Sequence, residues 1–249
     1  MPIDFLNLKT QFDNDGYFVF KNFVKNNFIL QLIKEINNSQ NTLKYFDKFG
    51  NLRRVEKLYD KGKYLIDLNK KISDILRQVF DKEFLIFKDK FNAKPPGGEG
   101  FFAHYDGVFQ FVNSNNKKKN GWYEYGDFFV STLIAIDECS KENGALELSK
   151  SHKGNFNELL QNTKKDGTPA LSTNMESKTL FNLINLNQGD MVVFSNTCPH
   201  RSGKNDSLNT RRVIYYTYTP NNNGSKYDEY FKDKVDSKNK SKALSEKWF

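Results

Sequence analysis

The chain of 249 residues has 37% apolar residues and two cysteines, a composition that fits one globular domain without a disulfide framework. Its formal net charge of +8 is dispersed apart from residues 117–119, so we expect a solvated basic surface and no nucleic-acid partner. The N-terminus lacks a basic segment followed by a long apolar stretch, which predicts no secretory signal, no membrane span and a cytoplasmic protein.

Helical patterns come first along the chain. Residues 3–15 are predicted to form a short helix that ends at a glycine, and residues 17–20 follow as a strand. Apolar residues then recur at helical spacing over residues 25–38 and again over residues 63–80. These patterns predict a largely helical N-terminal part that extends to about residue 83.

Strands dominate from residue 84 onward. Runs rich in β-branched and aromatic residues, with turn signals between them, predict strands at residues 84–91, 128–136, 179–186, 191–194 and 212–219. Helices followed by strands predict a single α+β domain over residues 1–249, with a β-sandwich or barrel core over about residues 84–220. The polar tail, about residues 221–249, is expected to form a helix around residues 227–235 and a loosely ordered end.

Two of the three histidines stand where an iron site needs them. His104 opens the triplet His104-Tyr105-Asp106, and His200 follows the predicted strand 191–194. In a strand, residues i and i+2 share a face, so His104 and Asp106 can reach one metal ion together. Two imidazoles and one carboxylate suit Fe(II) and leave positions open for O₂ and a keto acid, whereas structural zinc prefers four protein ligands. By itself the His-x-Asp spacing is a weak signal, and a loop histidine is the ordinary alternative for His200.

An arginine pair follows the distal histidine. Arg211 lies eleven residues after His200 and, with Arg212, opens the last predicted strand. A guanidinium forms a planar fork to a carboxylate, so one of the pair can hold the far carboxylate of 2-oxoglutarate. Strand alternation lets only one of them point inward, and a surface salt bridge is the ordinary alternative for Arg211.

Taken together, these segments resemble the phytanoyl-CoA dioxygenase family of Fe(II)/2-oxoglutarate-dependent oxygenases over most of residues 10–220. The matching stretches are residues 94–98, 104–106, 143–154, 189–190 and 199–212. The resemblance implies a double-stranded β-helix core (jelly-roll, cupin-like) with flanking N-terminal helices. It also implies that His104, Asp106 and His200 ligate Fe(II). Arg211, Ser202 and Trp122 would then contact 2-oxoglutarate. The sequence departs from the family's Pro-Gly-Ser-His at residues 149–152, which read Ser-Lys-Ser-His.

The implied activity is hydroxylation of an unactivated C–H bond in a small, possibly anionic metabolite, with succinate and CO₂ as co-products. Family members that halogenate lack the metal carboxylate, so Asp106 favours hydroxylation. The partners expected are this substrate and O₂, for a monomer or homodimer. A cupin-like metal-binding protein or isomerase that does not use 2-oxoglutarate is the alternative. A non-enzymatic β-sandwich that binds carbohydrate or nucleic acid is a second one.

Several residues could contact the substrate. Lys88, Lys90, Asn92 and Lys94 share one face if their strand is regular. Inside a pocket they would favour a carboxylate, phosphate or phosphonate group. On the outside they would be lysines that protect an edge strand, and both readings stay open. Phe129 is one of several aromatic residues that could form an apolar wall.

Overall fold

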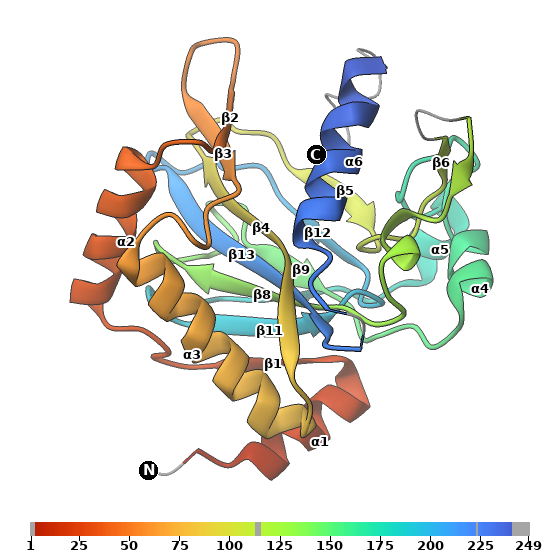
Figure 1. The fold of residues 1–249 in the computed structure, drawn as a ribbon, viewed down its shortest axis with the longest axis horizontal. Coiled ribbons are helices and arrows are strands. Elements are labelled where there is room, and N and C mark those ends of the chain that lie inside the picture. Colours follow the sequence, from red (N-terminus) through yellow and green to blue (C-terminus); the bar gives the residue numbers. More distant parts are fainter. Residues whose placement is uncertain (1–2, 113–115, 223, 241–249) are drawn as a thin grey trace.

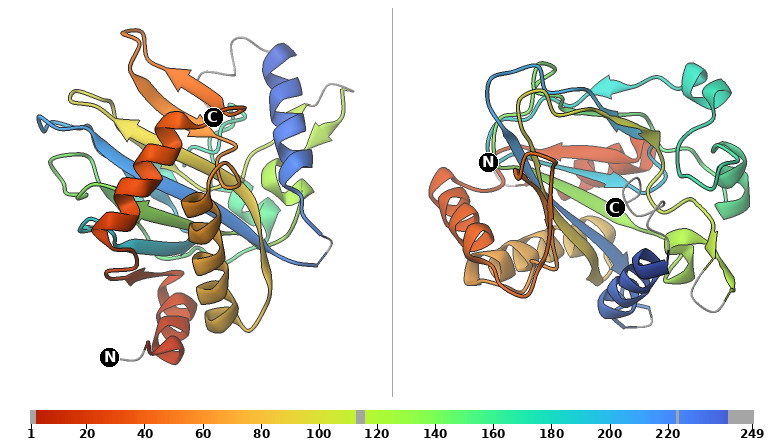
Figure 2. Two further views of the ribbon diagram at one scale, coloured as in Figure 1. Left: turned by 60° about the vertical axis from the view of Figure 1, so that its left-hand side comes forward. Right: turned by 90° about the horizontal axis from the view of Figure 1, so that it is seen from above.

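The computed structural model describes residues 3–112, 116–222 and 224–240, without the side chains of residues 237–240. In these residues two antiparallel sheets pack against each other, and helices cover the outer face of the larger sheet (Figures 1 and 2). The helices are α1 (Phe5–Asp15), α2 (Asn26–Asn38), α3 (Lys63–Phe80), η1 (Gly121–Glu124), α4 (Phe156–Gln161), α5 (Thr173–Lys178) and α6 (Tyr227–Lys240). The predicted α+β class is confirmed.

From β4 onward the chain passes repeatedly from one sheet to the other, as in a jelly-roll. The large sheet runs β1 (Tyr17–Phe20), β11 (Met191–Ser195), β8 (Val130–Ala135), β13 (Arg211–Pro220), β4 (Phe84–Lys94), β3 (Leu52–Glu56) and β2 (Leu43–Phe46). The small sheet runs β10 (Asn182–Leu183), β9 (Leu146–Leu148), β12 (His200–Ser202) and β5 (Phe101–His104). A separate pair consists of β6 (Phe111–Val112) and β7 (Lys118–Lys119).

Strand alternation gives the large sheet two different faces. On β13, Ile214 and Tyr216 pack into the core under the helices. The alternate residues Arg211 and Val213 face the small sheet, where Val213 joins a second apolar cluster and Arg211 borders a cavity. The helix side is therefore a continuous apolar core, and the inner side combines apolar packing with a polar cavity.

The two predicted amphipathic helices are confirmed as α2 and α3. Helix α3 buries Leu65, Leu68 and Ile72, spaced three and four residues apart, against the large sheet. Figure 1 shows α2 and α3 lying along the same side of this sheet. Of the helices described, none is both long and apolar enough to cross a membrane.

Two expectations are corrected. The N-terminal part expected to be helical also supplies β2 and β3, which extend the large sheet beyond β4. The strand expected at residues 179–186 is reduced to β10, because this segment lies at the sheet edge, where Leu180 is 85% exposed. The predicted tail helix is present as α6, and residues 241–249 of the tail lie outside the described residues.

Asp89 on β4 joins three parts of the fold. Its fully buried carboxylate accepts hydrogen bonds from the backbone N–H groups of Lys57, Leu58 and Tyr59, at 2.6–2.8 Å. It also accepts one from the Tyr227 hydroxyl at the start of α6, at 3.2 Å. One side chain thus ties the turn after β3 and the C-terminal helix to β4.

Replacing Asp89 by Ala should therefore lower the free energy of unfolding by about 3 kcal/mol, because several buried donors lose their acceptor at once. Urea unfolding measures the change. Asp74→Ala is the matched control, since exposed Asp74 makes only a surface contact with Arg77 and should change stability by less than about 0.5 kcal/mol. A loss below about 1 kcal/mol for Asp89→Ala would contradict this account.

Candidate metal and substrate site

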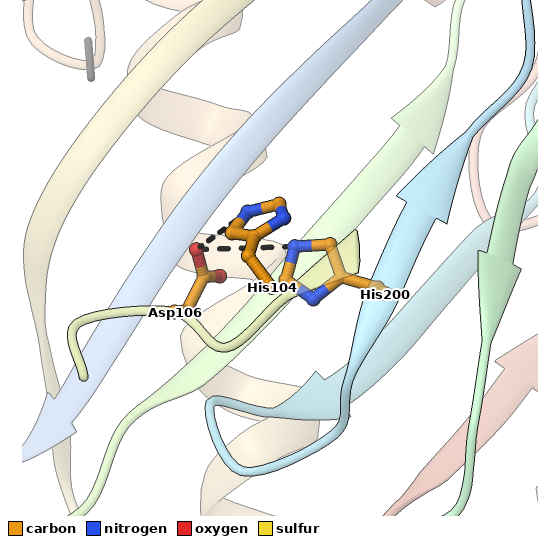
Figure 3. Close-up of side chains that lie close together, drawn as sticks. All are labelled: His104, Asp106 and His200. Atoms are coloured by element: carbon orange, nitrogen blue, oxygen red, sulfur yellow. Dashed lines mark ion pairs between the residues drawn. The ribbon is translucent and has the colours of Figure 1, made fainter. Parts of the chain in front are cut away.

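Three side chains converge between the sheets. His104 is the last residue of β5, Asp106 follows two residues later, and His200 is the first residue of β12. β5 and β12 pair directly, with His104 opposite His200. One ligand atom of each of the three side chains lies within 4.8 Å of the others (Figure 3). The structure thus brings together the residues that the sequence selected.

Hydrogen bonds orient both imidazoles. Nδ1 of His104 lies 2.9 Å from the Phe102 carbonyl oxygen, and Nδ1 of His200 lies 3.0 Å from the Cys198 carbonyl oxygen. A carbonyl can only accept, so Nδ1 carries the hydrogen and Nε2 keeps its lone pair. Each Nε2 lies 3.9 Å from Oδ1 of Asp106. Backbone carbonyls that hold imidazoles in this way are typical of the outer shell of a metal site.

The protonation states also suit a metal. Burial, with His200 nearby, lowers the pKa of His104 to about 3, and burial lowers the pKa of His200 as well. Burial alone would raise the pKa of Asp106, but His200, His104 and neighbouring lysines outweigh it and hold the pKa below its usual value. Neutral imidazoles and an ionised carboxylate are the forms that bind a cation at neutral pH.

A cavity of about 230 Å³ opens beside this triad. Its walls come from both sheets and from the loop that precedes β5. The lining residues are Tyr45, Arg53, Arg54, Lys90, Asn92, Ala93, Lys94, Glu99, Gly100, Phe101, His104, Asp106, Leu146, His200, Arg201, Ser202, Arg211 and Tyr215. Cationic side chains outnumber acidic ones here, so the cavity suits an anion.

Arg211 is the inward member of the arginine pair. It is 5% exposed, and its Nε and Nη1 atoms have no hydrogen-bond acceptor among the described residues. The thiol of Cys139 lies beside it, but burial raises the pKa of this thiol to about 11, so it brings no negative charge. Arg212 points the other way and pairs with Asp137 at 2.7 Å. A buried guanidinium with unused donors fits a carboxylate ligand.

Lys94 and Ser202 complete this end of the cavity, which we call the arginine end (Lys94, Ser202 and Arg211). The Lys94 ammonium donates to Ser202 Oγ at 3.0 Å and to the Gly203 carbonyl at 2.5 Å. Burial and the neighbouring Arg211 lower the pKa of Lys94 to about 7. Two cations and a hydroxyl are therefore grouped without a carboxylate among the residues that line this end.

A second cationic group lies further along β4, which we call the cation wall (Arg54, Lys88, Lys90 and Asn92). The Lys90 ammonium lies 4.4 Å from the ring centre of Tyr215. Burial, Lys88 and Arg54 lower the pKa of Lys90 to about 7. Since β4 lies between β13 and β3, it is not an edge strand, and the edge-protection alternative for these lysines is wrong.

Lys90 of the cation wall is well separated from Lys94 of the arginine end, with Asn92 between them on β4. Arg211 pairs with Lys94 across the β13–β4 ladder, and Tyr215 pairs with Lys90. The four residue steps from Arg211 to Tyr215 span roughly 13 Å of strand. The cavity can therefore receive two anionic groups rather than one.

Two predicted contacts lie outside the cavity beside Arg211. Trp122 is buried beside Phe87 and Phe129, with the Lys88 ammonium 5.2 Å from its ring, and it lines a small neighbouring pocket with Lys88 and Asp106. Phe129 was expected to contact substrate, which is corrected: it is fully buried in the core under the helices. It immediately precedes β8, where the chain turns that side chain away from the cavity.

Sequence reasoning missed the contribution of the β2–β3 hairpin. Tyr45, Arg53 and Arg54 all line the cavity, although they belong to the part expected to be helical. The available signal was a turn at Gly50, which has φ +80°, between two short alternating segments.

Comparison with known proteins gives a consistent result. The sequence profile of the phytanoyl-CoA dioxygenase family matches residues 12–213. A 2-aminoethylphosphonate dioxygenase from the uncultured bacterium HF130_AEPn_1 is 27% identical over 241 residues, which cover 91% of this chain and 86% of that protein. A methylphosphonate hydroxylase from Gimesia maris is 28% identical over 166 residues, which cover 66% of this chain and 56% of that protein.

Solved structures share the fold. EctD from S. alaskensis with 2-oxoglutarate and 5-hydroxyectoine has a TM-score of 0.65 at 16% identity, covering 88% of this chain and 77% of that chain. The epimerase SnoN in complex with Fe³⁺, alpha ketoglutarate and nogalamycin RO has a TM-score of 0.62 at 11% identity, covering 87% of this chain and 83% of that chain. The jelly-roll expectation is confirmed by these neighbours.

The triad geometry predicts that the purified protein binds one divalent ion. Asp106→Ala should weaken Co(II) binding by at least about 100-fold, more than the loss of an outer-shell partner costs, since it removes the one carboxylate of the set. Equilibrium dialysis measures the affinity, and Asp127→Ala, at an exposed position, is the control. One equivalent bound by Asp106→Ala with unchanged affinity would exclude the triad as the site.

Proposed function

Because this chain belongs to the phytanoyl-CoA dioxygenase family, and so is an oxygenase, we propose that it hydroxylates a small phosphonate with Fe(II), O₂ and 2-oxoglutarate. The single observation that carries the substrate class is the cation wall, which faces the triad from β3 and β4. A phosphonate dianion carries the charge and the multiple acceptor oxygens that such a wall can bind.

The donor set of the triad fits Fe(II), and His104, Asp106 and His200 would hold it. The arginine end fits the far carboxylate of 2-oxoglutarate, which Arg211 and Ser202 would bind. When bound, iron and 2-oxoglutarate supply the oxidising chemistry and leave succinate and CO₂. The protein supplies position, charge and protection from water.

The cation wall then remains for the substrate. Lys88 and Lys90 have no ion pair within 4 Å among the described residues, and each ammonium lies over aromatic rings instead. The amide of Asn92 accepts a hydrogen bond from Arg54 Nε at 3.3 Å, which leaves its own N–H groups for a ligand. With 2-oxoglutarate assigned to the arginine end, the positive charge of the cation wall is still available for a second anion.

The relatives support phosphonate over other anions. One is described as a 2-aminoethylphosphonate dioxygenase and another as a methylphosphonate hydroxylase. Both names join the reaction type of the family to an oxyanion of the kind that the cation wall suits. The cavity of about 230 Å³ suits a small molecule.

Phe101 and Phe102 pack against the His104 ring of the triad. Their rings stack 4.4 Å apart, and each packs edge-on near the His104 ring. Apolar rings at this position limit the access of water to the reacting centre and offer a surface to the carbon chain of a short substrate.

The arginine end has a direct test. Arg211→Ala should raise the KM for 2-oxoglutarate about 100-fold, the equivalent of about 3 kcal/mol, because the carboxylate loses a charge-assisted fork. Succinate formation at varied 2-oxoglutarate measures it, with Arg212→Ala as the neighbouring control. An unchanged KM would refute the role of Arg211, and wild-type turnover without 2-oxoglutarate would favour a cupin-like enzyme.

The substrate class is tested by succinate release with methylphosphonate and 2-aminoethylphosphonate, against neutral alcohols of similar size. We expect turnover with a phosphonate only. Lys90→Ala should raise the phosphonate KM about tenfold through loss of one charge contact, with the KM for 2-oxoglutarate unchanged. Lys118→Ala, an exposed lysine on β7, is the control. Turnover with the neutral compounds alone would overturn the proposal.

A further inference from the structure

Helix α6 lies beyond the family match, which ends at residue 213, yet it packs against the site wall. Its residues Tyr227, Tyr230 and Phe231 are buried in the main core. Figures 1 and 2 show α6 standing beside β4 and the β2–β3 hairpin. The C-terminal helix therefore shares a boundary with the cation wall.

A buried ion pair connects α6 to β3. The Lys234 ammonium lies 2.5 Å from Oε2 of Glu56, and the two side chains are 1% and 0% exposed. The Tyr45 hydroxyl donates to the same oxygen at 3.2 Å. Burial alone would raise the pKa of Glu56, but Lys234 and Arg54 outweigh it and leave the pKa at about 2. A charged pair in this setting contributes little to stability by itself, so another role is indicated.

The ion pair contacts the cation wall through Glu56. Oε1 of Glu56 lies 3.8 Å from Nη1 of Arg54, while Nε of Arg54 donates to Asn92 on the other side. Arg54 therefore lies between Glu56, an ion-pair contact without a hydrogen bond, and Asn92, which accepts one, with only 19% of its side chain exposed. From the same helix, the ring of Tyr230 lies 5.6 Å from the Lys88 ammonium. Lys88 therefore lies near a ring of α6, and Arg54 lies near the carboxylate that pairs with α6.

We propose that α6 is a positioning element of the substrate site, in which Lys234 and Glu56 hold Arg54 ready for the substrate oxyanion. Arg54, Lys88 and Lys90 repel one another, so Arg54 needs a fixed counter-charge on its outer side to stay near the cavity. A pre-oriented guanidinium also loses less conformational freedom when an anion binds. The inference rests on the proposed function, because it assigns the oxyanion to the cation wall.

A purely structural role for the pair makes a different prediction. If the ion pair only connected α6 to β3, its loss would lower thermal stability and would weaken the binding of the oxyanion and of 2-oxoglutarate together. A positioning role changes the dissociation constant of the oxyanion, leaves that of 2-oxoglutarate unchanged, and acts through Arg54 alone.

The key variant is the double substitution Glu56→Gln with Lys234→Met. It removes one negative and one positive charge, so the net charge beside the wall is unchanged, and it avoids the unpaired buried carboxylate that Lys234→Met alone would leave. The probes are methylphosphonate and inorganic phosphate, titrated by anaerobic calorimetry into the enzyme loaded with Fe(II) and 2-oxoglutarate. Lys232→Met, at an exposed position on the same helix, is the matched control. The single variant Lys234→Arg keeps the positive charge and should bind the probes like the wild type.

We expect the double variant to raise the dissociation constant of the probes roughly tenfold, as for one charge-assisted hydrogen bond lost, with 2-oxoglutarate binding within about twofold of wild type. In an Arg54→Ala background the same double substitution should have no further effect, since the coupling runs through Arg54. Unchanged probe binding in the double variant, or an equal additional loss in the Arg54→Ala background, would overturn the inference.

Failure of the proposed function has a separate signature. Wild-type protein that binds phosphate but hydroxylates no phosphonate would refute the substrate class, while the effect of the double variant on phosphate binding would still test α6. Wild-type protein that binds neither probe would overturn both.

Discussion

The pairing of β13 with β4 sets the direction of the charged side chains that these two strands contribute to the cavity. Because side chains alternate along a strand, one register sends Lys88, Lys90 and Lys94 inward and Asp89 into the helix-side core. A slip of one residue would reverse these positions and place lysines in an apolar core, at a cost of several kcal/mol for each. The apolar residues on the outer face of β13 therefore fix the geometry of the polar inner face.

This constraint also explains how one sheet can serve two anions. The register places Arg211 beside Lys94 and, four residues further along β13, Tyr215 beside Lys90. The triad comes from the other strands, β5 and β12, and lies against the same inner face, where Ser131 of β8 donates to Asp106 at 3.1 Å. The two cationic groups and most of the metal-binding residues are therefore positioned by strands rather than by flexible loops, which favours precise placement.

The sequence predicted site residues correctly where the spacing of neighbouring residues along a strand decides which side chains meet. The i, i+2 spacing of His104 and Asp106 needed only strand alternation to be interpreted. Alternation left Arg211 and Arg212 as alternatives, and the family resemblance selected Arg211, which lines the same cavity as the triad. Arg54 could not be found in this way, because its strand is short and is stabilised by pairing with β4 rather than by local pattern. Phe129 was misplaced because the direction of a residue just before a strand depends on where the chain enters the sheet.

The cation wall shows how a protein keeps like charges close together and still available. Its members are held by neutral groups: the rings of Trp122 and Tyr230 lie near Lys88, the ring of Tyr215 lies near Lys90, and Asn92 accepts from Arg54. A carboxylate in each of these places would neutralise the wall and compete with an anionic ligand. Among the described residues, the carboxylate outside the triad that pairs with the wall is Glu56, which is already engaged by Lys234 and so does not cancel the charge of Arg54. Neutral contacts and a shared counter-ion therefore leave the wall without a carboxylate that would compete with an anionic ligand.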